Sequence, residues 1–138
     1  MYKLQRKERV FEQLELSNAD GSLYKVIDVD LDADTTVKNI SEKQIALINA
    51  QKQLQTADAT NTTKTLELIG KVTVDLFEAI FGTENTQDIL KFYENKPVEM
   101  CRDILPFITE VIIPQVRKTA SDNKKNLLNG YKKRGWFK

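Results

Sequence analysis

Apolar and polar side chains alternate with a period of two in the first third of the chain. Within residues 23–31 (LYKVIDVDL), Ile27, Val29 and Leu31 fall on one face, and residues 10–16 (VFEQLEL) alternate in a similar way. The link between them, SNADGS, is rich in residues that accept tight-turn conformations. The pattern predicts a β-hairpin. An isolated hairpin is marginal in water, so we expect it to lie against helices or against another subunit's strands.

After the hairpin the apolar positions recur every three or four residues, which is typical of helices. A first helix is predicted after a cap at Asp34 or Thr35, and a second over residues 65–81, with residues 56–64 as the connector between them. The apolar stripe of the second helix is broader than contact with one neighbour requires. We therefore expect the second helix to be the central one.

A third, short helix is predicted between Gly82, which closes the preceding helix, and Pro97, with Thr83 or Thr86 as its cap. Its apolar side chains are Ile89, Leu90, Phe92 and Tyr93. Four such residues on so short a helix indicate either ordinary core packing or contact with a partner. Both alternatives stay open at this point.

A fourth helix is predicted over residues 98–118, with a kink or break near Leu105. The reason is that Pro106 and Pro114 lack an N–H group and clash with the preceding turn. Residues 104–113 are apolar on nearly every side of this helix. Such a segment is either fully buried or partly a docking surface, and we expect more apolar surface here than a small monomer can cover.

These elements predict a mainly α protein in which an N-terminal β-hairpin precedes a bundle of four to five helices, the last one kinked by proline. We expect one domain over residues 1–118 and a basic, partly disordered C-terminal extension over residues 119–138. The extension holds six Lys or Arg against one acid, a net charge of +5. The whole chain carries +1, so residues 1–118 carry −4, which describes a basic tail on a mildly acidic body.

Side chains suited to catalysis are scarce. The chain has no histidine and one cysteine, Cys101, which we interpret as a small buried apolar residue. The aspartates at positions 28, 30, 32 and 34 lack the central glycine and terminal glutamate of a calcium loop, so we interpret them as a solvated face. We expect no enzyme activity, no catalytic residues, no metal and no cofactor. The N-terminus lacks the apolar core of a signal peptide and no apolar run has spanning length, which favours a cytoplasmic protein without membrane contact.

Three blocks of the sequence resemble the tail assembly chaperones of long-tailed bacteriophages and prophages of Gram-positive bacteria. The blocks are FEQLELSNADGSLYKVIDVDL, LFEAIFGTENTQDILKFYENKP and MCRDILPFITEVIIPQVRK, and the likeness covers roughly residues 9–118. The resemblance implies a chaperone that binds the tape measure protein, keeps it soluble and helps to recruit tail tube subunits. It also implies a longer, frameshifted form that contacts the tube protein, a location in the host cytoplasm, and absence from the mature virion.

The residue pattern adds a hypothesis about where a helical client would bind. The candidate partner-binding residues are Phe92, Tyr93, Leu105, Phe107, Ile108, Val111, Ile112 and Ile113. We also expect a homo-oligomer, because the hairpin exposes a strand edge. The main alternative is a small helical nucleic-acid-binding regulator that uses the basic tail, KKNLLNGYKKRGWFK, although no recognition helix is evident. A generic adaptor of another assembly is a further alternative.

Overall fold

The computed structural model describes the backbone of residues 1–133 and the side chains of residues 1–129. In chain order the elements are β1 (Val10–Ser17), β2 (Leu23–Leu31), α1 (Ala33–Thr56), α2 (Thr62–Phe81), α3 (Thr83–Phe92), α4 (Pro97–Phe107), the π-helical turn η1 (Ile108–Ile112) and α5 (Ile113–Lys133). The predicted fold class is confirmed: the protein is mainly helical, begins with an antiparallel hairpin, and ends in a helix with a kink.

The hairpin matches the strands expected from the alternating pattern. β1 and β2 pair with Val10 opposite Leu31 and Leu14 opposite Ile27, which turns the apolar face of β2 toward the helices. In the connecting turn the Asp20 carboxylate accepts a hydrogen bond from the backbone N–H of Ser22 at 2.9 Å. The hairpin packs on its own helices, as expected for a sheet of two strands.

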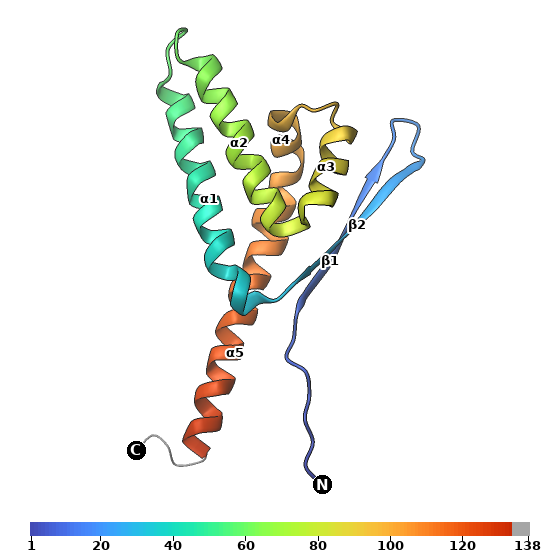
Figure 1. Ribbon diagram of the computed structural model, residues 1–138, viewed down its shortest axis with the longest axis vertical. Coiled ribbons are helices and arrows are strands. Elements are labelled where there is room, and N and C mark those ends of the chain that lie inside the picture. The colour runs from blue at the N-terminus through green and yellow to red at the C-terminus, as the bar shows by residue number, and fades with distance from the viewer. Residues whose placement is uncertain (134–138) are drawn as a thin grey trace.

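α1 and α2 form an antiparallel pair whose tip projects from the rest of the molecule (Figure 1). α2 begins at Thr62, three residues before the predicted start. The Asp58 carboxylate accepts hydrogen bonds from the N–H groups of Thr60 and Asn61 and so organises the turn. The predicted cap of α1 is corrected as well. α1 begins at Ala33 with Asp32 at the cap position, so Asp34 and Thr35 lie inside the first turn.

The short helix α3 lies between Gly82 and Pro97, as predicted. Gly82 has a φ of 83°, a left-handed conformation that glycine adopts freely, and it is the last residue before α3. Thr83 and Thr86 are therefore inside the helix, and neither is its cap. Pro97 begins α4 at the first helical position, where the missing N–H costs nothing.

The predicted disturbance of the last helix occurs slightly later than Leu105. η1 lies between the two prolines, and the N–H of Ile113 donates to the carbonyl of Ile108, five residues back. A wider turn of this kind keeps the chain helical where proline prevents regular bonding. α5 then continues without interruption across residue 118, the predicted domain boundary, to Lys133. The predicted disorder at the C-terminal end falls on residues 134–138, outside the described part of the chain.

One apolar core joins all of these elements. Its largest fully enclosed side chains come from both strands and from α1, α2, α3, α4, η1 and α5: Val10, Ile27, Val29, Ile40, Leu47, Leu76, Phe77, Ile89, Met100, Ile108, Ile112 and Val116. Among the described residues, no helix is long and apolar enough to cross a membrane.

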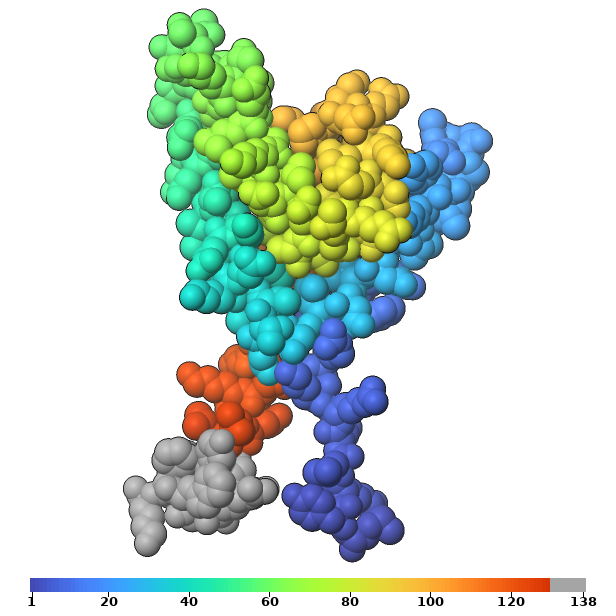
Figure 2. Space-filling model, viewed as in Figure 1, coloured from blue at the N-terminus to red at the C-terminus, as the bar shows by residue number. Residues whose placement is uncertain are grey.

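Two ends of the molecule extend away from this core. At one end, the α1–α2 tip and the α3–α4 corner diverge, and Figure 2 shows a hollow between them. At the other end, the N-terminal arm and the distal half of α5 project as two separate prongs. Both ends provide surface that the core does not cover.

Candidate functional site

Three of the predicted partner-binding residues lie in the core. Ile108 and Ile112 are 0% exposed and Ile113 is 4% exposed. Ile104, Ile108 and Ile112 recur every four residues and so form one inward stripe, and the π-helical turn adds the neighbouring Ile113 to it. Because their own chain encloses these side chains, we remove Ile108, Ile112 and Ile113 from the candidate site.

Three further predicted residues, Leu105, Phe107 and Val111, are half-buried. Phe107 stacks on Phe81 with ring centroids 6.5 Å apart and an interplanar angle of 12°. The expected excess of exposed apolar surface near the prolines is therefore wrong, because none of the large apolar side chains of residues 104–113 is fully exposed. Contact of these three side chains with a partner stays a prediction.

Phe92 and Tyr93 connect α3 to the hairpin and to α4. The Phe92 ring lies 5.0 Å from the ring of Tyr24 on β2 and 5.1 Å from the ring of Tyr93. Lys25 on β2 also forms an ion pair with Asp88 on α3. The short helix is thus tied to the hairpin by an aromatic contact and an ion pair.

Partial burial, together with the nearby Asp103 carboxylate, raises the pKa of Tyr93 to about 12. Both effects favour the neutral phenol. The side chain is half-buried, and contact of Phe92 and Tyr93 with a partner stays a prediction.

An open apolar surface lies elsewhere, in a groove between α2 and the start of α4. Its floor is formed by Leu66, Gly70 and Val74, which recur every four residues on α2, together with Pro97 and Val98 of α4. The groove has a volume of about 660 Å³. We call this set of five residues the α2–α4 groove.

Gly70 determines how closely the two helices approach. A Cβ atom at position 70 would lie 3.0 Å from the Cγ of Pro97, closer than side chains normally tolerate. The absence of a side chain therefore allows the proline ring to sit against the backbone of α2. The same absence leaves the middle of the groove floor flat.

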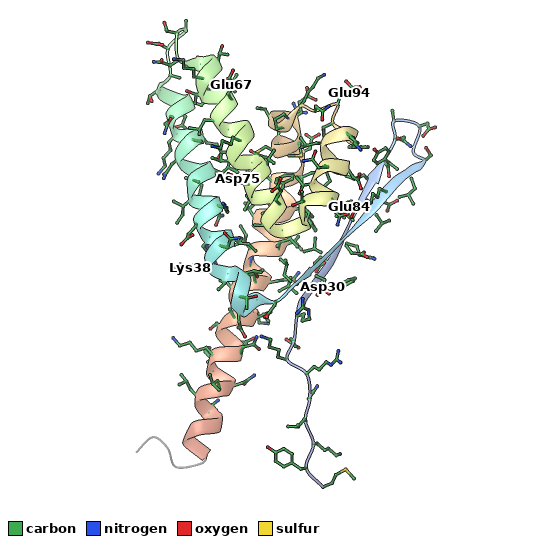
Figure 3. The ribbon with its side chains drawn as sticks, viewed as in Figure 1. Asp30, Lys38, Glu67, Asp75, Glu84 and Glu94 are labelled. Carbon is green, nitrogen blue, oxygen red and sulfur yellow. The ribbon has the colours of Figure 1, made fainter. Side chains whose placement is uncertain are left out.

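Charged side chains line the outer edge of the α2–α4 groove. Glu67, Lys71 and Asp75 are spaced by four residues on α2, next to the apolar floor. Glu67 and Asp75 are labelled in Figure 3. The edge thus presents an acid, a base and an acid along about two turns of helix.

A smaller pocket of about 240 Å³ lies on the other side of Leu66 and Val98. It is lined by Leu54 of α1, by Ile69 of α2 and by Cys101 of α4, among others. Burial raises the pKa of the Cys101 thiol, so the neutral apolar form is favoured. The apolar surface therefore continues across α2 toward α1.

The groove offers an apolar surface to a binding partner. Floor residues are aliphatic, and within the described residues no three His, Cys, Asp or Glu side chains group together in a way that would hold a metal ion. An open apolar floor beside alternating charges suits the apolar stripe of an amphipathic helix. One feature of the sequence pointed to this site, namely the unusual breadth of the α2 stripe, while the roles of Gly70 and Val98 were missed.

Comparisons with models of protein families, with curated proteins and with solved structures found no match to this chain. The likeness to tail assembly chaperones therefore remains a resemblance carried by the three sequence blocks.

Proposed function

We propose that the protein is a non-enzymatic chaperone that holds a helical segment of a client protein in the α2–α4 groove. The observation that carries this proposal is the combination of an aliphatic floor, half-open to solvent, with a charged edge on one helix. Val98 is 40% exposed and Leu66 and Val74 are half-buried, so all three are available to a partner.

The dimensions of the groove fit a short helical segment. From Thr63 to Asp75 the lining residues of α2 span thirteen residues, with a rise of about 18 Å along the helix. A client helix with small or aliphatic residues every three to four positions would place three of them on the floor. Basic residues of the client would lie opposite Glu67 and Asp75, and an acid would lie opposite Lys71.

The resemblance supplies the proposed identity of the client. We propose that it is the tape measure protein, a long chain prone to coiled-coil formation, which the chaperone keeps soluble in the host cytoplasm. Recruitment of tail tube subunits would use a longer, frameshifted form, and the chaperone would be absent from the mature virion. A homo-oligomer is part of the same proposal.

Co-expression with the large coiled-coil protein of the neighbouring gene tests the function. We expect the chaperone to move most of the client from the pellet to the soluble fraction, and the two proteins to co-purify. A client that stays insoluble beside the folded wild-type chaperone would contradict the proposal.

Two matched variants test the groove itself. Val98→Asp places a charge on the groove floor, while Ile45→Asp places the same charge on α1, where Ile45 is 56% exposed and lies outside the groove. Both variants should fold, because both positions are exposed. We expect Val98→Asp to lose the client and Ile45→Asp to retain it. Equal retention by the two variants would rule out the groove while leaving the chaperone function intact.

A further inference from the structure

Positive charge is concentrated in two segments of this protein, one at the N-terminus and one at the C-terminus. Residues 1–9 contain four basic side chains and one acid, and residues 113–138 contain eight basic side chains and one acid. These two segments together carry +10. The whole chain carries +1, so residues 10–112 carry −9.

The fold brings the first segment and the distal described part of the second, up to residue 133, to the same end of the molecule. Figures 1 and 2 show the N-terminal arm and the distal half of α5 projecting from the body in the same direction. Asp34 joins them: its carboxylate accepts a hydrogen bond from the Lys7 ammonium at 3.0 Å and another from the Asn123 amide at 3.3 Å. More than one hundred residues separate these segments in the sequence.

A polar cleft of about 600 Å³ lies between the arm and α5. Its lining consists of four amide, two basic and two acidic side chains: Gln5, Arg6, Glu8, Asp122, Asn123, Lys125, Asn126 and Asn129. Amide and cationic groups are the side chains that most often contact phosphate and sugar oxygens of nucleic acids.

The cations at this end fall into two groups. Lys7 and Arg9 are held by Asp32, Asp34 and Asp30 at 2.8 to 3.0 Å, so they fix the base of the arm. Lys3, Arg6, Lys124 and Lys125 form no ion pair with any residue that the structure describes. The second group is therefore available to an anionic ligand.

We propose that this end of the molecule, the arm together with distal α5, binds the phosphodiester backbone of nucleic acid without sequence preference. A polymer with regularly spaced phosphates satisfies two basic prongs at once, which a single phosphate does not. Exposed Tyr2 on the arm adds an aromatic face for an unstacked base, which favours a single strand. The site is separate from the α2–α4 groove and does not depend on the proposed chaperone function.

Fluorescence anisotropy of the full chain with a labelled single-stranded oligothymidylate of about 20 nucleotides tests the site. We expect binding at 50 mM salt that weakens about 50-fold at 200 mM, which corresponds to about four phosphates neutralised on a single strand. Absence of binding at 50 mM salt would overturn the proposal. Equal competition by poly-glutamate at the same charge concentration would also overturn it, because the site would then recognise acidic protein.

Charge reversals of equal size locate the binding site. Arg6→Glu with Lys125→Glu reverses one charge on each prong, and Lys52→Glu with Lys64→Glu makes the same change at the opposite, α1–α2 end. All four residues are exposed, so circular dichroism should show the wild-type fold in each variant.

We expect the first pair of changes to weaken binding at least ten-fold and the second pair less than three-fold. Equal weakening by the two pairs would show that binding follows only net charge, and would overturn the site. The single variant Arg6→Glu tests the contribution of the N-terminal arm by itself. It should weaken binding several-fold, and full affinity in this variant would exclude the arm.

Discussion

Two apolar regions of this protein have opposite environments. Residues 104–113 are apolar on nearly every side, yet the chain encloses Ile104, Ile108, Ile112 and Ile113. The α2–α4 groove contains fewer large apolar residues, yet its floor stays open. The comparison shows that apolar content along the chain does not decide exposure, because exposure depends on how the neighbouring helices converge or diverge.

The physical reason lies in the positions of the two regions. The segment with the prolines passes through the middle of the fold, where it contacts α2, and it continues into α5, which packs on α1 and on β1. The groove lies where α2 continues toward its tip while α4 begins at Pro97, so the two helices separate with no element between them (Figure 1). Convergence buries the first region, and divergence exposes the second.

Truncation of one side chain in each region gives the largest expected contrast. Ile108→Ala should lower the free energy of unfolding by about 2–5 kcal/mol, because it leaves a cavity in a packed core. Val98→Ala should lower it by less than about 1 kcal/mol, because the side chain is 40% exposed. Urea denaturation followed by circular dichroism measures both values, and similar values would remove the distinction between the two regions.

Filling the groove floor should have an intermediate effect. Gly70→Val adds a branched side chain where even a Cβ atom would lie 3.0 Å from Pro97, so we expect a loss of about 1–3 kcal/mol from overpacking. Gly70→Ala is the matched control. Alanine favours the helix by about 1 kcal/mol relative to glycine, and this gain offsets part of the destabilisation caused by the close contact with Pro97. Stability of the valine variant equal to that of the wild type would show that α4 moves freely away from α2.

High pH should give the smallest effect, and it tests whether Tyr93 is shielded from solvent, as the first region is, or open to it, as the second is. The unfolded chain loses the phenol proton near pH 10, while the folded protein keeps it to about pH 12. The unfolded state therefore binds fewer protons in this interval, and stability should fall as the pH rises through it.

Tyr93→Phe keeps the ring next to Phe92 and removes the titrating group. The difference in unfolding free energy between the wild type and this variant should be constant below pH 10 and should shrink above it. A constant difference up to pH 12 would show that the Tyr93 phenol is exposed to solvent in the folded protein.

The sequence by itself determined the local elements. Alternation predicted β1 and β2 closely, and the three- to four-residue period predicted the helices. Gly82 and Pro97 marked the limits of the short third helix. These features depend on the preferences of neighbouring residues, such as the left-handed φ of glycine and the missing N–H of proline. The caps were predicted less well, because Asp32 is held by Lys7 from a distant part of the chain.

Only the tertiary structure decided which apolar and charged groups remain uncovered. Burial of Ile108 and Ile112 depends on other helices, and the groove depends on the close approach of Gly70 to Pro97. The meeting of the N-terminal arm with α5 depends on contacts between residues far apart in sequence. A periodic pattern states which face of an element is apolar, but it carries no information on whether another element lies against that face. That is why the hairpin and helices could be predicted, and why the groove and the basic end could not.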